Sequence, residues 1–277
     1  MTKKYKLDKE DIITIGDKTL YRIVALVDIG ACVKAGDDGG YIESEDNLSH
    51  EGDAWVYDNA TVYEDAKVYG NACVCETAEV SGDAQIYGKA KVCDNANVYG
   101  NARVYDNAYV VGNAHVCGSA KVGGNAWVSG NARIRENSWV SGNARIIDDA
   151  QIRGNANVYD NALICEGADV YGNTLVFGKA KVYGEALVNG NARICGTAKV
   201  GEGIDYFCVQ SFGSRWRTTT FFRTENNWCV VCGCFLGTIG EFRQKVKETH
   251  GDSLIAQEYL MVADLMEFRI KRRNKEL

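Results

Sequence analysis

Histidine is the side chain best suited to acid–base chemistry near neutral pH, and this chain has three: His50, His115 and His250. Only His115 falls in a regular stretch, NAHVCG, where it is a weak candidate for a catalytic general base. In the fold expected below its neighbours are Asn97 and Arg133. No adjacent carboxylate would orient the ring there, and the arginine would lower its basicity.

Cysteine is abundant, with 11 residues, and one group has spacing that suggests metal chemistry. Cys229, Cys232 and Cys234 resemble half of a zinc site, which needs four ligands, and only Cys208 or His250 could complete the set. Alternation along a strand would place Cys229 on the face opposite the other two. Metal binding there is a weak prediction, buried free thiols are the expectation for all the cysteines, and we expect no cofactor.

Cationic and aromatic side chains cluster near the C-terminus at Arg215, Trp216, Arg217 and Arg223. They could bind a small anionic ligand or a protein partner, or could simply be solvated residues of a hairpin. The net charge of −6 argues against a dedicated nucleic-acid binder. The polar N-terminal segment and the lack of a long apolar run predict a cytoplasmic protein without a membrane span.

The elements that position these residues come from a short repeat that runs from Asp53 to Glu202 as about 25 hexads, beginning DAWVYD NATVYE DAKVYG. The second position is nearly always Ala and the fourth is always Val or Ile. A short strand with its middle residue inward explains this pattern, whereas a helix would need a period of about 3.6. Gly, Asn and Asp at the sixth and first positions form tight corners in a chain that has no proline.

Three hexads close a triangular coil of about 18 residues, and about eight coils stack into a parallel β-helix. The hexad resembles the [LIV]-x-x-x-[STAV]-x rule of left-handed β-helix proteins, and it is most similar to the hexapeptide-repeat β-solenoid proteins of YdcK type from bacteria and phages, loosely labelled transferase-like. The resemblance covers roughly residues 20–202 and includes the segment 33–60. It implies a mainly β fold with left-handed winding.

The resemblance also raises the possibility of acyl transfer, because left-handed β-helix acyltransferases act through a histidine between subunits. That role would fall to His115. The hexads, however, run without an insertion, and such enzymes need a loop excursion to build the acceptor pocket. The sequence therefore favours a protein that is not an enzyme.

Two further regions flank the repeat: residues 1–52 form an N-terminal segment and cap, and residues 203–277 a small α+β domain. We expect strands over 206–211, 218–223 and 228–235. A capping box from Thr238 to Glu241 predicts a helix ending near His250, and a second amphipathic helix follows from Ser253 to about Arg272. This domain would block the open end of the rod.

The repeat register also sorts the outward side chains into three faces. The second face is polar and the third carries a tyrosine ladder, which favours packing over ligand binding. The first face carries an apolar strip, a predicted surface for a dimer, a trimer or another protein. The strip comprises Trp55, Tyr57, Tyr109, Val111, Trp127, Ile147, Leu163 and Tyr183.

The function that this pattern favours is a scaffold or binding protein acting through the solenoid faces and the C-terminal domain. Two alternatives remain open. One is a hexapeptide-repeat acyltransferase, and the other is a phage-encoded inhibitor or sponge that captures a host protein or a nucleotide.

Overall fold

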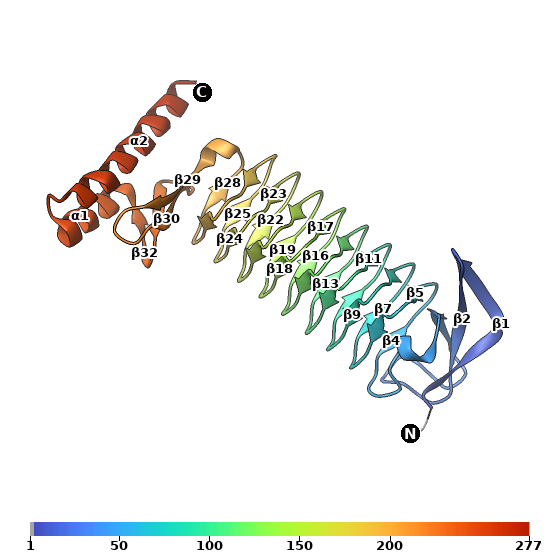
Figure 1. Ribbon diagram of the computed structural model, residues 1–277. Helices are drawn as coiled ribbons and strands as arrows, with labels where there is room; N and C mark the ends of the chain where they lie inside the picture. The colour runs from blue at the N-terminus through green and yellow to red at the C-terminus, as the bar shows by residue number, and fades with distance from the viewer. Residues whose placement is uncertain (1–2, 277) are drawn as a thin grey trace.

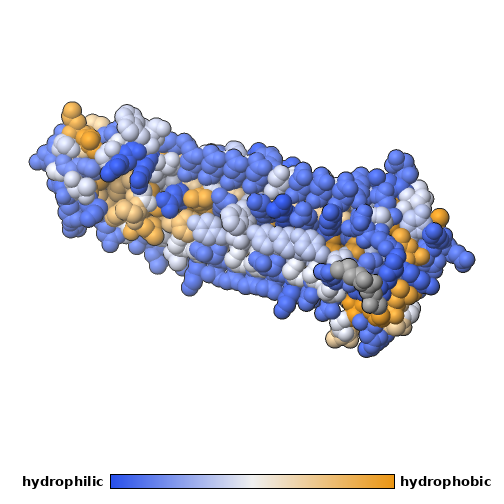
Figure 2. Space-filling model, turned by 60° about the horizontal axis from the view of Figure 1, so that its bottom comes forward, coloured by the Kyte–Doolittle hydropathy of each residue, from blue (hydrophilic) through white to orange (hydrophobic). Residues whose placement is uncertain are grey.

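The computed structural model describes residues 3–276 as a straight rod with a cap at each end (Figure 1). Each hexad contributes one two-residue strand, and strands of successive coils pair in parallel. The view in Figure 2 shows a mostly hydrophilic rod surface, with apolar surface gathered towards the two ends. The predicted mainly β solenoid is confirmed.

Three parallel sheets form the three faces of the rod. The first face has nine strands: β4 (Trp55–Val56), β7 (Cys73–Val74), β10 (Lys91–Val92), β13 (Tyr109–Val110), β16 (Trp127–Val128), β19 (Arg145–Ile146), β22 (Leu163–Ile164), β25 (Lys181–Val182) and β28 (Lys199–Val200). The second contains β5 (Thr61–Val62), β8 (Glu79–Val80), β11 (Asn97–Val98), β14 (His115–Val116), β17 (Arg133–Ile134), β20 (Gln151–Ile152), β23 (Asp169–Val170) and β26 (Leu187–Val188). The third contains β6 (Lys67–Val68), β9 (Gln85–Ile86), β12 (Arg103–Val104), β15 (Lys121–Val122), β18 (Trp139–Val140), β21 (Asn157–Val158), β24 (Leu175–Val176) and β27 (Arg193–Ile194).

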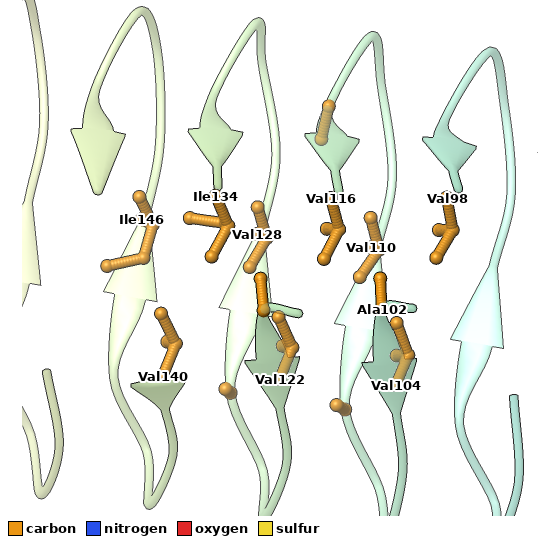
Figure 3. Close-up of a cluster of buried hydrophobic side chains, with 14 of the residues drawn as sticks. Val98, Ala102, Val104, Val110, Val116, Val122, Val128, Ile134, Val140 and Ile146 are labelled. Atoms are coloured by element: carbon orange, nitrogen blue, oxygen red, sulfur yellow. The ribbon is translucent and has the colours of Figure 1, made fainter. Parts of the chain in front are cut away.

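The interior of the rod is a continuous column of Val, Ile and Ala side chains (Figure 3). Val104, Val128 and Ile134 are fully buried, as their equivalents are along the rod. Two buried hydroxyl groups replace alanine methyls without being left unpaired. Ser138 donates to the carbonyl oxygen of Arg135 and Thr174 to that of Tyr171, each at 2.6 Å. The core therefore tolerates these two departures from the repeat.

The corners use the two polar positions of the hexad in different ways. Positive φ angles fall at the sixth position, which is Gly or an acidic residue, as at Asp106 (φ 57°). The Asp106 carboxylate accepts the backbone N–H of Gly124 in the next coil at 3.1 Å, which offsets the cost of a left-handed conformation in a residue with a Cβ. Asparagines at the first position form a ladder, in which the Asn107 amide donates to Asn125 at 3.1 Å.

The N-terminal segment extends the second face and covers the first coil. β1 (Tyr5–Ile15) and β2 (Lys18–Ala25) pair antiparallel, and β3 (Asp38–Ile42) joins β2 to β5, which makes this sheet eleven-stranded. A short 3-10 helix, η1 (Glu45–Asn47), follows. The buried Asn47 amide donates to the carbonyl oxygens of Glu64 and Ala66, at 2.8 and 3.0 Å, so the end of the rod is hydrogen-bonded as well as covered.

The C-terminal domain begins with η2 (Gly203–Asp205) and an antiparallel sheet of β29 (Tyr206–Phe212), β30 (Arg217–Arg223), β31 (Trp228–Cys232) and β32 (Phe235–Thr238). Two helices follow, α1 (Ile239–His250) and α2 (Leu254–Glu276). The expected single strand over 228–235 is wrong, because Gly233 adopts a φ of 60° and turns the chain into a fourth strand. The predicted capping box at Thr238 and Glu241 is confirmed.

This sheet closes the second end of the rod with one face and packs on the helices with the other. Phe222 and Val231 join the core cluster of the rod, whereas Phe221 and Val230 pack with residues of α1 and α2. The Arg193 backbone N–H donates to the Thr220 hydroxyl at 3.0 Å across the junction. The exposed edges of the last coil are thereby paired or covered.

Two further expectations concerned the state of the cysteines and the presence of a membrane span. Free thiols were expected throughout, but Cys75 and Cys93, which stack in adjacent coils with Cα atoms 4.6 Å apart, form a disulfide. That spacing lies within the range a disulfide requires. Within residues 3–276, no helix combines the length and apolar character needed to cross a bilayer.

Candidate functional site

A basic hollow in the C-terminal domain brings together part of the predicted binding cluster. Arg215 lies in the turn after β29 and Arg217 begins β30, while Lys245 and His250 come from α1. The hollow has a volume of about 270 Å³. The complete lining is Ser214, Arg215, Arg217, Cys232, Gly233, Cys234, Phe235, Phe242, Lys245, Val246, Thr249, His250 and Tyr259.

The floor of this hollow is built from the domain core. Phe242 and Tyr259 are buried and meet edge to face, with ring centroids 5.9 Å apart. The His250 ring stacks on Tyr259 at 5.6 Å, and the Tyr259 hydroxyl accepts the backbone N–H of Ser214 at 3.3 Å. These contacts tie the Arg215 turn to α1 and α2, so the cations sit on a packed base rather than on a loose loop.

The charged side chains that line the hollow are all basic. Its lining contains no carboxylate. In the described part of the chain, Arg215 and Arg217 make no ion pair, and Lys245 has only an exposed contact of 3.5 Å with Glu248. Unpaired guanidinium groups over an apolar floor favour an anion, because they supply several charge-assisted donors to one acceptor group.

The other two members of the predicted cluster lie elsewhere. Arg223, at the far end of β30, pairs with the buried carboxylate of Asp205 at 3.4 Å, and Arg273 of α2 pairs with the same carboxylate. Trp216 is 77% exposed and borders a separate shallow hollow with Arg193 of the rod. Arg223 therefore holds the domain together and does not line the basic hollow.

Sequence reasoning missed Lys245 and His250, although both belong to a helix that it predicted. The signal was present in part, since both residues fall on α1 within five positions of each other. Their position beside the β29–β30 turn depends on the packing of α1 against the sheet, and a sequence pattern does not report that packing. The structure therefore adds an ammonium group and an imidazole to the site.

The cysteines of this domain do not form the zinc site considered above. Cys229 packs towards the rod core and Cys232 towards the helices, as strand alternation predicts. Among the residues that the structure describes, the one set of three metal-ligating groups in mutual reach is Cys73, Cys75 and Cys93 in the rod. Burial raises the pKa of the Cys229 thiol, which keeps it protonated.

His115 remains a poor general base in the structure. It pairs in register with Asn97 on one side and Arg133 on the other, so no carboxylate in its column orients the ring. His50 has a structural setting: its Nδ1 accepts the Lys4 backbone N–H at 3.2 Å and its ring stacks on Tyr5 at 4.4 Å. The Nε2 of His50 faces the Glu45 carboxylate at 3.5 Å, so both ring nitrogens are engaged within the N-terminal cap, whereas His115 has no orienting carboxylate in its column.

The side chains of the apolar strip on the first face are less exposed than the repeat pattern suggested. Trp55 is 1% exposed and lies against Tyr5 of the N-terminal cap, so it is not available to a partner. Trp127 is the most exposed member at 39%, and it stacks on Tyr109 at 5.2 Å. The half-buried members are Tyr57, Tyr109, Val111, Ile147, Leu163 and Tyr183.

The tyrosine ladder of the third face forms as stacked rings. Tyr69, Tyr87 and Tyr105 follow one another at centroid distances of 5.0 and 5.4 Å. The ladder ends at Gly123, which has no side chain to continue it. The Tyr105 ring fills the space beside this glycine, and a Cβ added to Gly123 would lie 2.3 Å from the nearest atom of that ring. Cross-strand stacking accounts for these rings without a ligand.

Comparison with known families agrees with the architecture. The model of the YdcK β-solenoid repeat matches residues 102–118, which span β12 to β14. The search of curated proteins found no match. The matched hexads are continuous with the rest of the rod, whose strands pair in the same parallel order, so the rod is a β-solenoid similar to the YdcK repeat.

Proposed function

We propose that this protein is a non-enzymatic binding protein, in which the solenoid is a rigid rod and the C-terminal domain binds a small anion that carries a phosphate group. The basic hollow carries this proposal. Arg215, Arg217, Lys245 and His250 converge on a hollow whose lining contains no acidic side chain.

The size of the hollow limits the ligand. Sites for drug-sized molecules have volumes of about 300–1,000 Å³, so about 270 Å³ suits a phosphate, a diphosphate or part of a nucleotide. The apolar floor of Phe242 and Tyr259 would contact a sugar or base, while the guanidinium groups bind the phosphate oxygens. This is the chemistry expected of a protein that captures a small nucleotide.

The test is calorimetric titration of the full chain with inorganic phosphate, pyrophosphate and AMP, for the wild type, Arg217→Glu and Arg133→Glu. Arg133 is an exposed arginine on the second face, so its variant changes the net charge equally. We expect at least one anion to bind the wild type, with affinity reduced at least about tenfold in Arg217→Glu and unchanged in Arg133→Glu.

The proposal fails if none of the three anions binds the wild type. It also fails if Arg133→Glu loses as much affinity as Arg217→Glu, since that result would reflect overall charge and not a built site.

We further propose that the rod associates with a second copy through the strip around Tyr109 and Trp127. A stacked pair of aromatic rings with an exposed tryptophan offers the kind of rigid apolar area that dominates protein interfaces. The solution mass of the wild type and of Trp127→Glu, measured by light scattering, tests this association.

A further inference from the structure

Three cysteines meet on the outer surface of the rod near its N-terminal end. Cys73 and Cys75 flank the buried Val74 on β7, so both side chains point outward from the first face. Cys93 follows β10 and stacks directly beside Cys75 in the next coil. Their three sulfur atoms lie within 4.8 Å of one another, and all three side chains are half-buried.

Once the Cys75–Cys93 bond is reduced, the three sulfurs can separate to the spacing that one metal ion imposes. Zn–S bonds of about 2.3 Å in a tetrahedral site place ligand sulfurs about 3.8 Å apart. The backbone at the cluster is fixed by the sheet: the Cys73 and Cys75 N–H groups donate to the carbonyl oxygens of Ala90 and Val92, each at 2.9 Å. The cluster is therefore preorganised by the coil stacking.

The surroundings also fit a thiolate site. Lys91 pairs in register with Cys73, so its ammonium group can offset the negative charge of a metal held by three thiolates. Cys32 of the N-terminal segment lies close enough to Cys73 to interact with it electrostatically.

We propose that the reduced protein binds one thiophilic cation, Zn²⁺ or Cu⁺, through Cys73, Cys75 and Cys93, with a water molecule completing the four-coordinate shell in the case of Zn²⁺. Soft thiolate ligands select these ions over Mg²⁺ or Ca²⁺. The disulfide between Cys75 and Cys93 and the bound metal are mutually exclusive, because both need the same two sulfurs. Reducing that bond takes two electrons and two protons, which a phosphine reductant and water supply in the test below, with the phosphine leaving as its oxide.

The experiment titrates the metal-free full chain, reduced with a phosphine under anaerobic conditions, with Co²⁺. Thiolate-to-cobalt charge-transfer absorption reports how many sulfurs bind. We expect a 1:1 complex in the wild type. Since loss of even an outer-shell partner costs roughly 10–100-fold in affinity, Cys73→Ser, Cys75→Ser and Cys93→Ser should each weaken binding by at least about 100-fold.

Serine is a mild substitution here, because Ser129 occupies the position equivalent to Cys75 three coils along the rod, and Ser81 and Ser141 occupy the same hexad position on the other two faces. Two controls match the chemistry without touching the cluster. Cys117→Ser alters a half-buried free cysteine after β14, and the Cys232→Ser, Cys234→Ser double variant removes thiols of the C-terminal domain. Both should bind Co²⁺ as the wild type does.

Several outcomes would overturn the proposal: no stoichiometric absorption in the reduced wild type, an unchanged spectrum and affinity in Cys73→Ser, or loss of binding in the Cys232, Cys234 double variant instead. If Cys73→Ser binds Co²⁺ as the wild type does, Cys73 is not a ligand, and the cluster is only the disulfide pair of Cys75 and Cys93. Displacement of bound Co²⁺ by Zn²⁺ or by Cu⁺ then identifies the preferred ion.

Discussion

Replacing Ile134 with alanine tests whether the rod interior is packed as the structure shows. Ile134 lies on β17 with no exposed surface, in register between Val116 and Ile152 (Figure 3). The coils cannot close around a lost side chain, because the backbone is hydrogen-bonded on both sides; the Cys117 N–H donates to the Ile134 carbonyl oxygen at 2.9 Å. The free energy of unfolding of Ile134→Ala should therefore be about 3–4 kcal/mol lower than that of the wild type, in the upper part of the range for isoleucine-to-alanine substitutions in protein cores.

Two further variants make the magnitude interpretable. Ile134→Val should lose about 1 kcal/mol, because it removes one buried methyl group. Arg133→Ala, the exposed neighbour on the same strand, should stay within about 0.5 kcal/mol of the wild type. Urea denaturation followed by circular dichroism measures all three. A loss below about 1 kcal/mol for Ile134→Ala, or an equal loss for Arg133→Ala, would refute the reasoning.

Three other predictions follow from the corners, the N-terminal cap and the first face. Asp106→Ala should lower the free energy of unfolding, measured by urea denaturation, by about 1 kcal/mol, because alanine must keep the left-handed φ and the hydrogen bond from the Gly124 N–H is lost. Asp106→Gly should lower it less, because glycine adopts this φ without strain. Equal losses in the two variants would contradict this explanation. Burial lowers the pKa of Lys4 to about 8 from 10.5, so the unfolded chain holds more protons between these values and Lys4 makes folding more favourable as pH rises through that window. The slope of stability against pH should therefore fall in Lys4→Met, and an unchanged slope would argue against a buried ammonium group. Light scattering should give a dimer or trimer for the wild type and a monomer for Trp127→Glu, with Trp139→Glu on the third face as a control; a monomeric wild type would exclude assembly through the strip.

The rod could be predicted from the amino-acid sequence alone. Val or Ile at one position and Ala at another, repeated every six residues, allow only a stack of short strands with those side chains inside. The pattern is local and each coil contacts only its neighbours, so no distant contact was needed to predict it. The same reasoning located both helices of the C-terminal domain, because a capping box is also a local signal.

Finer features of the repeat depended on neighbouring coils. The sequence predicts Gly, Asn and Asp at the corners, but the different hydrogen bonds that these residues make form only between stacked coils. Asp106 reaches the backbone of the coil above, and Asn107 reaches the equivalent Asn125. The 18-residue separation of Cys75 and Cys93 is visible in the sequence and predicts that they lie in adjacent coils, but the approach of their two sulfur atoms appears only in the structure.

The two candidate sites depend on contacts between segments that are far apart in the sequence or in different coils. The basic hollow needs α1 to pack beside the β29–β30 turn, which brings Lys245 to Arg217 and leaves Arg223 at Asp205. The thiol cluster needs adjacent coils in register, with the N-terminal segment folded back towards Cys73. Repeat periodicity specifies neighbours along the rod, whereas the packing of its two caps rests on non-repeating contacts that no short pattern encodes.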